Sequence, residues 1–198
     1  MRGYFGIGAE RISKAMNVGS LFRTAHAFGA SFAFTIDARY ERGDLAKADT
    51  SDAVGQLPFY RFPDLDSMVL PDRCEIVGVE LTEDAIELPS FRHPTRAAYV
   101  LGPERGSLSP EMLQRCTHVV KIPTSFCINV GLAGAITLYD RQMNLGGYQV
   151  RPVRPGGPES PAPEHAHGGP TSRREMEVFR IGTPVAELRR FEEESSGG

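Results

Sequence analysis

Short apolar runs alternate along the first 148 residues with segments in which apolar side chains recur every three or four positions. The runs predict strands, and the periodic segments predict helices. We expect strands at 3–8, 32–36, 57–62, 75–81, 97–101 and 119–122, and helices at 17–28, from 109 and from 129, with shorter helical stretches at 65–70 and from 82. This alternation predicts an α/β fold with a mainly parallel sheet and helices on both faces.

The stretch from 117 to 143 contains a predicted strand, Pro123, a compact polar turn and a helix that Asn129 would cap. Small residues, including Gly131 and Gly134, fill the first two turns of this helix. A glycine inside a helix costs ~1 kcal/mol relative to alanine. We therefore expect backbone or a ligand to approach this face closely. The helix carries apolar residues near the 3.6-residue period at Val130, Leu132, Ala133, Ile136 and Met143.

A second strand also ends in a glycine-containing turn. The run Tyr99–Leu101 leads directly into a turn that contains Gly102, Glu104 and Gly106. Ligands of open α/β sheets bind outside the carboxyl ends of the strands. The turns after 101 and after 122 are therefore predicted to lie at one sheet edge and to form one pocket.

The first predicted helix begins near Asn17, which could cap it, and Gly29 would end it. Its apolar positions are Val18, Leu21, Phe22, Ala25 and Phe28. Arg23 lies off this apolar stripe in the second turn. From there, its side chain could point toward a ligand at the sheet edge.

The length of 198 residues fits one domain with an extension. We expect a folded domain over 1–148. Ten of the twenty residues at 151–170 are proline or glycine, so 149–173 is predicted to be a linker without a core. Residues 174–198 are predicted to form a weakly helical acidic tail.

The formal net charge of −3 lacks the overall basicity of a stand-alone nucleic-acid-binding domain, although a local basic patch stays possible. The three cysteines, Cys74, Cys116 and Cys127, form no C-x-x-C pair, so we expect neither a disulfide framework nor a metal site. No apolar run approaches the ~18 residues of a membrane span, and the amino terminus lacks an apolar signal core. We therefore expect a cytoplasmic protein without a membrane partner.

A nicotinamide-dependent dehydrogenase is rejected from the sequence. Its dinucleotide-binding turn would need G-x-G-x-x-G after the first strand. Here Gly6 and Gly8 are followed by Arg11 where the third glycine should stand.

Three blocks occur in a fixed order: Asn17, Gly19, Arg23 and Thr24; then Gly102, Glu104 and Gly106; then Ile122, Pro123, Asn129 and Val130. In this order they resemble the SpoU/TrmH family of RNA ribose 2′-O-methyltransferases, in the SPOUT superfamily. The resemblance covers residues 3–148. Each block alone is weak, and their specificity comes from their succession.

The resemblance implies an α/β fold whose C-terminal segment forms a deep trefoil knot. It also implies S-adenosylmethionine bound in a bent shape within that knot, and a homodimer. The implied reaction transfers a methyl group to a ribose 2′-hydroxyl of tRNA or rRNA. The alternative is a catalytically weak or inactive module that binds S-adenosylmethionine or RNA.

The same resemblance implies two groups of site residues. The catalytic group is Arg23, Asn17, Glu104 and Asn129, and the cofactor-binding group is Glu80, Leu81, Leu101, Gly102, Gly106, Ile122, Thr124 and Cys127. This chain departs from the family at Cys127 and Gly131, where serines are common, and in a shorter turn before Asn129. Arginine stays protonated near neutral pH, which argues against a base acting alone. The resemblance implies that Arg23 acts together with a phosphate of the substrate, and the sequence leaves open whether it serves as a base or as an electrostatic anchor.

Overall fold

The structure is a computed structural model that describes residues 3–40, 57–149, 151–152 and 154–158. The chain divides into two compact units, Met1–Tyr148 and Gln149–Gly198. The sheet and the helices described below belong to the first unit. The acidic tail expected at 174–198 lies outside the described residues.

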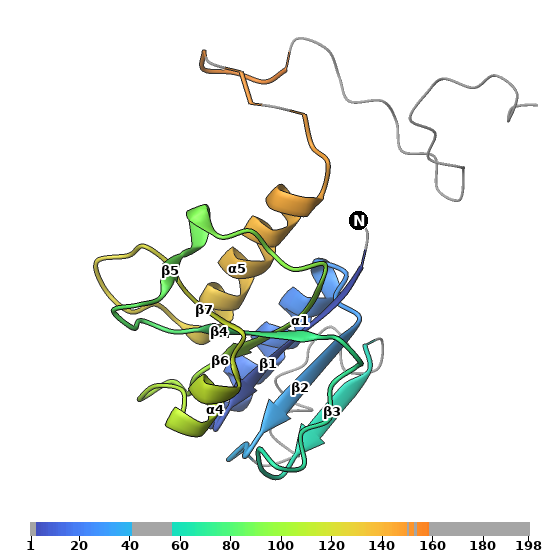
Figure 1. Ribbon diagram of the computed structural model, residues 1–198, viewed down its shortest axis with the longest axis vertical. Coiled ribbons are helices and arrows are strands. Elements are labelled where there is room, and N and C mark those ends of the chain that lie inside the picture. Colours follow the sequence, from blue (N-terminus) through green and yellow to red (C-terminus); the bar gives the residue numbers. More distant parts are fainter. Residues whose placement is uncertain (1–2, 41–56, 150, 153, 159–198) are drawn as a thin grey trace, which may run out of the picture. The chain divides into compact units, whose positions relative to one another are not determined.

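Seven strands of the described part form one sheet in the order β3-β2-β1-β6-β4-β7-β5, and every pairing is parallel (Figure 1). The strands are β1 (Tyr4–Glu10), β2 (Phe32–Ile36), β3 (Phe59–Phe62), β4 (Glu75–Val79), β5 (Ile86–Glu87), β6 (Arg96–Leu101) and β7 (His118–Lys121). The central strands β1 and β6 are buried along almost their whole length. Burial on both faces is what an all-parallel sheet requires, and it explains their near-continuous apolar sequences.

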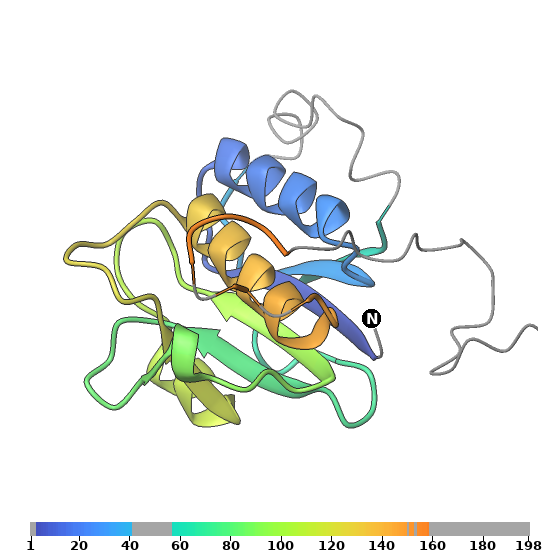
Figure 2. The ribbon, with the colours of Figure 1, turned by 90° about the horizontal axis from the view of Figure 1, so that it is seen from above.

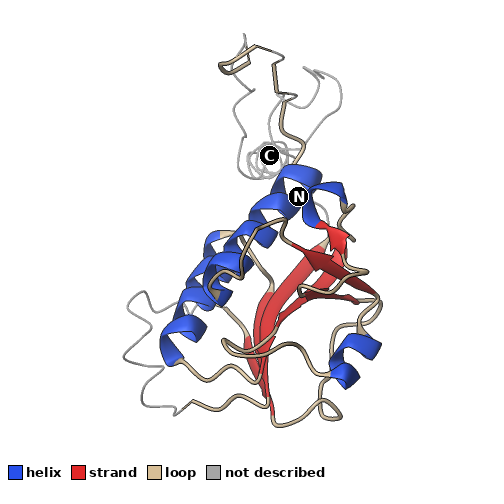
Figure 3. Ribbon diagram, turned by 90° about the vertical axis from the view of Figure 1, so that its left-hand side faces the viewer, coloured by secondary structure: helices blue, strands red, loops and turns tan. Residues whose placement is uncertain are grey.

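Helices cover both faces of the sheet, as predicted. The helices α1 (Ala15–Ala27) and α5 (Val130–Leu145) lie side by side on one face (Figure 2). The short α4 (Pro110–Arg115) lies on the other face (Figure 3), and a 3-10 turn, η1 (Leu88–Ser90), precedes β6. No helix in the described ranges is long and apolar enough to cross a bilayer.

The core has one apolar cluster on each face of the sheet. Under α1 and α5, side chains such as Ile7, Leu21 and Leu138 are almost completely buried. Under α4, the cluster includes Phe34 and Met112. The alternation of side chains along β2 and β6 thus supplies both clusters from the same strands.

The helix starts agree with the sequence in two cases of three. Asn129 caps α5 by accepting from Gly131 N at 2.8 Å, and Ser109 caps α4 by accepting from Met112 N at 3.1 Å. The third expectation was wrong, because α1 starts at Ala15 and Asn17 lies inside its first turn. Asn17 is buried there, and its amide has other partners.

Two predicted helical stretches are turns. At 65–70, the side chain of Asp64 accepts from Ser67 N at 2.8 Å, and Ser67 Oγ donates to Asp64 O at 2.9 Å. Such local side-chain bonds compete with helical ones. After Thr82 the chain makes one turn and enters β5, in which Ile86 pairs with Val120 of β7. Pairing with a neighbouring strand therefore replaces the helix expected there.

The small residues of α5 make room for α1. A Cβ atom on Gly131 would lie 2.6 Å from Ser20 Oγ, and one on Gly134 would lie 2.6 Å from Leu21 Cδ1. The close approach is therefore made by side chains of α1, and the expectation of backbone or a ligand at this face was wrong.

The buried face of α5 differs from its most apolar one. Gly131, Gly134, Thr137, Leu138 and Arg141 are buried. In contrast, the side chains of Leu132, Ile136 and Tyr139 are 60%, 40% and 52% exposed. Their spacing of four and three residues places them on one side of the helix. An apolar stripe of α5 therefore faces outward from the unit.

A buried polar network fixes the last turns of α5 to β6. Arg141 donates to Thr95 O at 3.0 Å and to the Tyr99 hydroxyl at 3.2 Å. His93 lies within hydrogen-bonding distance of Tyr99 Oη (2.6 Å) and Asp140 Oδ2 (2.9 Å). Burial lowers the pKa of His93, although the hydrogen bond to Asp140 opposes this shift. These contacts hold α5 over the centre of the sheet.

Candidate functional site

A cavity of about 550 Å³ lies at the carboxyl ends of β4, β6 and β7 and reaches the amino-terminal ends of α1 and α5. This volume lies in the range typical of small-molecule sites. Its position is the one expected for a ligand of a parallel α/β sheet. The turns after Leu101 and after Lys121 both contribute to its wall, so they form one pocket.

Eleven of the twelve residues singled out in the sequence line this cavity. They are Asn17, Glu80, Leu81, Leu101, Gly102, Glu104, Gly106, Ile122, Thr124, Cys127 and Asn129. The lining residues that were not among these twelve are Lys14, Val79, Pro103, Arg105, Lys121, Ile128, Val130 and Ala133. All of them except Lys14 and Ala133 directly adjoin one of the twelve in the sequence. Adjacency is therefore the signal that could have found most of them.

Arg23 does not line the cavity. It lies six residues after Asn17, which in an α-helix corresponds to roughly 9 Å along the axis and about two thirds of a turn around it. Its side chain is exposed. Arg23 is therefore on the outer surface of α1, where a macromolecule could reach it.

Glu104 is the most heavily hydrogen-bonded carboxylate of the cavity. Its Oε2 accepts from Ser13 N at 3.0 Å and Ser13 Oγ at 2.9 Å. Its Oε1 accepts from Lys14 N and Asn17 Nδ2, both at 2.9 Å. Burial alone would raise the pKa of Glu104, but the bonds from Asn17, Ser13 and Lys14 outweigh it and lower the pKa to about 2. Glu104 is therefore a fixed anion that ties its loop to the start of α1.

A chain of side-chain amides links the three motif blocks. Asn129 uses Oδ1 to cap α5, so its Nδ2 donates to Asn17 Oδ1 at 3.0 Å. Asn17 in turn donates through Nδ2 to Glu104. Asn129 Oδ1 accepts from the backbone of α5, and the Glu104 carboxylate can only accept, so the orientations of both side-chain amides are fixed. Each amide nitrogen keeps a second proton that remains available to a ligand.

Glu80 and Gly102 shape the floor of the cavity. Glu80 accepts from Leu81 N through Oε1 and from Leu108 N through Oε2, each at 2.8 Å. A Cβ atom on Gly102 would lie 3.1 Å from Leu108 N and 3.3 Å from the carbonyl carbon of Ser107. The loop that starts at Gly102 thus folds back onto its own first residue, and a side chain there would crowd it.

The turn between β7 and α5 forms the opposite wall. Thr124 Oγ1 donates to Phe126 O at 2.8 Å, and Cys127 is exposed at the cavity. The departure from serine at Gly131 has a steric cause, because Ser20 Oγ fills the place that a side chain at 131 would need.

Positive charge surrounds the cavity. Lys14 and Arg105 are exposed and contribute to its lining, as does Lys121, whose ammonium lies 3.3 Å from Glu83 O. Both acidic lining residues, Glu80 and Glu104, are held by N–H donors. In the described part of the chain, no group of three or more His, Cys, Asp or Glu side chains could hold a metal ion. The site therefore suits an organic ligand next to an anionic partner.

Residues 5–139 match the model of the SpoU rRNA Methylase family. Among curated proteins, the mouse (Mus musculus) tRNA (guanosine(18)-2′-O)-methyltransferase TARBP1 is 28% identical over 152 residues, which cover 70% of this chain and 9% of that protein. This chain thus spans about a tenth of the length of that relative.

Solved structures share the fold. The SpoU methyltransferase AviRb from Streptomyces viridochromogenes, in complex with the cofactor AdoMet, superposes with a TM-score of 0.66 at 19% identity, over 75% of this chain and 60% of that one. A second structure, which concerns 2-OH methylation of C/U34 on tRNA, superposes with a TM-score of 0.63 at 20% identity, over 74% and 94% of the two chains.

Proposed function

The chain belongs to the SpoU rRNA Methylase family, and on this premise we propose that it is an S-adenosylmethionine-dependent methyltransferase that acts on a ribose 2′-hydroxyl of tRNA or rRNA. One observation carries the proposal. Residues of all three motif blocks, up to 112 positions apart in the chain, meet at one cavity through the Asn129–Asn17–Glu104 contacts. The AdoMet complex of AviRb and the tRNA enzymes among the relatives support the cofactor and the substrate class.

The lining fits the proposed cofactor. Apolar side chains such as Leu101, Ile122 and Val130 suit a purine ring, and the neighbouring turns bring backbone N–H and C=O groups to the same space. We assign cofactor binding to Glu80, Leu81, Leu101, Gly102, Gly106, Ile122, Thr124 and Cys127. When bound, S-adenosylmethionine supplies an electrophilic methyl group on a sulfonium.

The polar residues of the cavity position the reacting groups. Glu104, with a pKa of about 2, is too weak a base to accept the hydroxyl proton near neutral pH. Its role in this proposal is to hold Asn17 and the loop in place. The second amide protons of Asn17 and Asn129 are then available to orient the ribose. Such positioning can supply up to ~7–11 kcal/mol of the barrier reduction.

Arg23 acts on the RNA side of the reaction in this proposal. From the outer surface of α1, its guanidinium grips a backbone phosphate in a bidentate manner. Methyl transfer would join the methyl carbon to the ribose oxygen and leave the donor as a thioether, and the 2′-hydroxyl proton would pass to solvent water beside the phosphate that Arg23 holds. Because arginine alone stays protonated, we assign Arg23 as an electrostatic anchor.

We also propose a homodimer. The outward apolar stripe of α5 at Leu132, Ile136 and Tyr139 is the surface that a second copy would cover. A dimer would also join two sets of basic side chains at the cavity rims into one RNA-facing surface. Light scattering on Ile136→Glu should then show a shift to monomer, whereas a wild-type monomer at micromolar concentration would refute the dimer.

The finer architecture belongs to the same proposal. The family likeness supports a deep trefoil knot near the C-terminal end of the folded unit and a methyltransferase domain over 1–148. The composition supports a linker over 149–173 and a tail over 174–198. We further propose that the protein works in the cytoplasm. An experimental structure that traces the chain through 75–145 would test the knot.

The experiment that tests the function follows methyl transfer from labelled S-adenosylmethionine to total RNA and maps the ribose methylation sites. Arg23→Ala should reduce transfer at least 100-fold while the Kd for S-adenosylmethionine changes by less than about threefold. Arg92→Ala is the matched control, because Arg92 is exposed and precedes β6, at the opposite end of this strand from the cavity. If wild-type protein binds the cofactor but methylates no RNA, the binding-module alternative replaces this proposal.

A further inference from the structure

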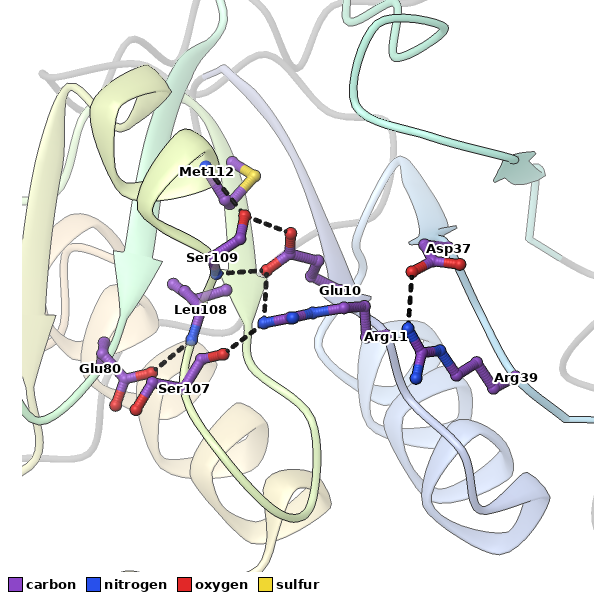
Figure 4. A network of polar contacts seen from close by, with 9 residues as sticks. All are labelled: Glu10, Arg11, Asp37, Arg39, Glu80, Ser107, Leu108, Ser109 and Met112. Carbon is purple, nitrogen blue, oxygen red and sulfur yellow. Dashed lines mark hydrogen bonds and ion pairs between the residues drawn. The ribbon is translucent and has the colours of Figure 1, made fainter.

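The loop at 102–109, hereafter the cofactor loop, is tied to the strands beside it by three charged side chains (Figure 4). Arg11 donates to Ser107 O at 2.7 Å, and Glu80 accepts from Leu108 N at 2.8 Å. Glu10 accepts from Ser109 N at 2.7 Å and from Ser109 Oγ at 2.6 Å. Three consecutive residues at the end of this loop are therefore held from β1 and β4, the neighbours of β6 on either side.

Glu10 is the least exposed of these anchors, with 2% of its surface accessible. Its nearest cation is Arg11, whose NH2 lies 3.8 Å from Oε2. Burying a carboxylate costs solvation, and an apolar side chain of the same size usually serves stability as well or better. Glu10 does not line the cavity, so the catalytic roles assigned above leave it unexplained.

The carboxylate of Glu10 sets the direction of the Ser109 hydroxyl. The hydroxyl proton points to Oε1, which leaves an oxygen lone pair to accept from Met112 N at 3.1 Å and cap α4. Both the end of the cofactor loop and the start of α4 thus depend on a single carboxylate at the end of β1.

The contacts between the two segments are reciprocal. Residues 10 and 11 hold 107 and 109, and Glu104 of the cofactor loop holds Ser13 and Lys14. Between these ties, residues 102–106 line the cavity. A shift at Ser109 would therefore move the wall that the cofactor contacts.

We propose that Glu10 is a positioning residue for cofactor binding, acting through Ser109 on the cofactor loop. This inference rests on the proposed function, because it takes the ligand of the cavity to be S-adenosylmethionine. Glu10→Gln keeps the size of the side chain but removes the charge and turns one acceptor into a donor. The amide then either opposes Ser109 N–H or competes with Met112 N for the serine hydroxyl.

Titration calorimetry with S-adenosylmethionine tests the proposal in four proteins besides the wild type. Glu10→Gln and Ser109→Ala should each raise the Kd about tenfold, and the double variant should raise it little further, because both changes break the same contact. Ile7→Val is the matched control. Ile7 lies in β1 and packs in the cluster under α1 and α5, so this change should lower stability without changing the Kd.

Limited trypsin digestion gives a second readout that needs no ligand. The cofactor loop contains the exposed Arg105, and cleavage after it should be faster in Glu10→Gln than in wild type and Ile7→Val. Should Glu10→Gln not fold, Arg11→Gln removes the Ser107 contact and the charge next to Glu10, and it should give the same acceleration.

The proposal would be overturned if Glu10→Gln bound S-adenosylmethionine with the wild-type Kd, or if the two single changes in Kd added up in the double variant. It would also be overturned if Glu10→Gln left the rate of cleavage after Arg105 unchanged, or if Ile7→Val changed the Kd or this rate as much as Glu10→Gln does. If the wild-type protein binds no S-adenosylmethionine, the proposed ligand is refuted. If Glu10→Gln nevertheless speeds cleavage after Arg105, the role of Glu10 in holding the cofactor loop stands.

Discussion

Glu104→Gln is the substitution whose effect follows most directly from the geometry. The carboxylate accepts from four donors, two on each oxygen: Ser13 N, Ser13 Oγ, Lys14 N and Asn17 Nδ2. A glutamine amide must turn its NH2 group toward one of these pairs. Because the Ser13 hydroxyl can turn and accept from the amide, the less costly orientation loses the Ser13 N bond alone, and the other three bonds lose the assistance of the negative charge.

The magnitude follows from ordinary hydrogen-bond energies. A hydrogen bond to a charged group contributes about 1.5–3 kcal/mol, and loss of the charge weakens each remaining bond by about 0.5–1 kcal/mol, so the lost bond and the three weakened ones together amount to about 3–6 kcal/mol. Ser13 is exposed, and its freed donor regains water. We therefore expect a net loss of about 2–4 kcal/mol. Since 1.4 kcal/mol corresponds to a factor of ten, the lower bound is a roughly 30-fold change in an equilibrium constant.

Cofactor binding should report most of this loss. The four bonds join the 102–109 loop to the start of α1, and their loss or weakening opens the cavity wall without exposing the core. Titration calorimetry should show a Kd for S-adenosylmethionine that is at least 30-fold higher, with a smaller change in the free energy of unfolding in urea. Glu83→Gln is the control, because Glu83 is an exposed carboxylate that does not line the cavity.

A Kd within threefold of wild type, together with an unfolding free energy within about 0.5 kcal/mol, would sink this reasoning. The four contacts would then contribute no more than the surface interactions that typically lie in this range. Glu104 would then not be needed to anchor the loop.

Three further outcomes follow from other features. Gly8→Ala should lower the free energy of unfolding in urea by about 1–3 kcal/mol or more, because the added Cβ would lie 2.5 Å from the Phe34 carbonyl oxygen on the paired strand. Stability should fall as the pH drops from about 4.5 toward 2, since the unfolded chain binds a proton at Glu104 before the folded chain does; acid titration followed by circular dichroism should show a larger loss in wild type than in Glu104→Gln. A chain that ends at residue 148 should bind S-adenosylmethionine with unchanged Kd in calorimetry, because every lining residue lies between Lys14 and Ala133; failure to fold would show that the first unit needs the rest of the chain.

Local sequence signals were sufficient for most of the fold. The apolar runs and the caps Ser109 and Asn129 placed the central strands and two helix starts, because these signals act over a few residues. The same signals failed at Asn17, whose side-chain amide donates to the distant Glu104 and does not cap α1. They also failed after Thr82, where an edge strand pairs with β7.

The site could be predicted in its members but not in its connections. The family resemblance identified eleven cavity residues, and several of them follow strands whose carboxyl ends share one edge of the parallel sheet. The amide chain from Asn129 through Asn17 to Glu104 joins residues about 90 and 112 positions apart, and no local pattern encodes it. The position of Arg23 outside the cavity was not predicted either, and the start of α1 was predicted two residues too late.

The pairing of β1 with β6 has a consequence for biosynthesis. Tyr4 lies opposite Arg96, so the first strand meets this neighbour only after about 90 further residues have been synthesised. At about 5–20 residues per second, the interval is on the order of 5–20 s. Throughout that time β1 can pair with β2 alone, and the backbone N–H and C=O groups along its other edge are open to other chains. A ribosome that pauses before residue 100 would therefore prolong the time in which the nascent chain can aggregate. The speed of translation across this region thus affects the yield of folded protein.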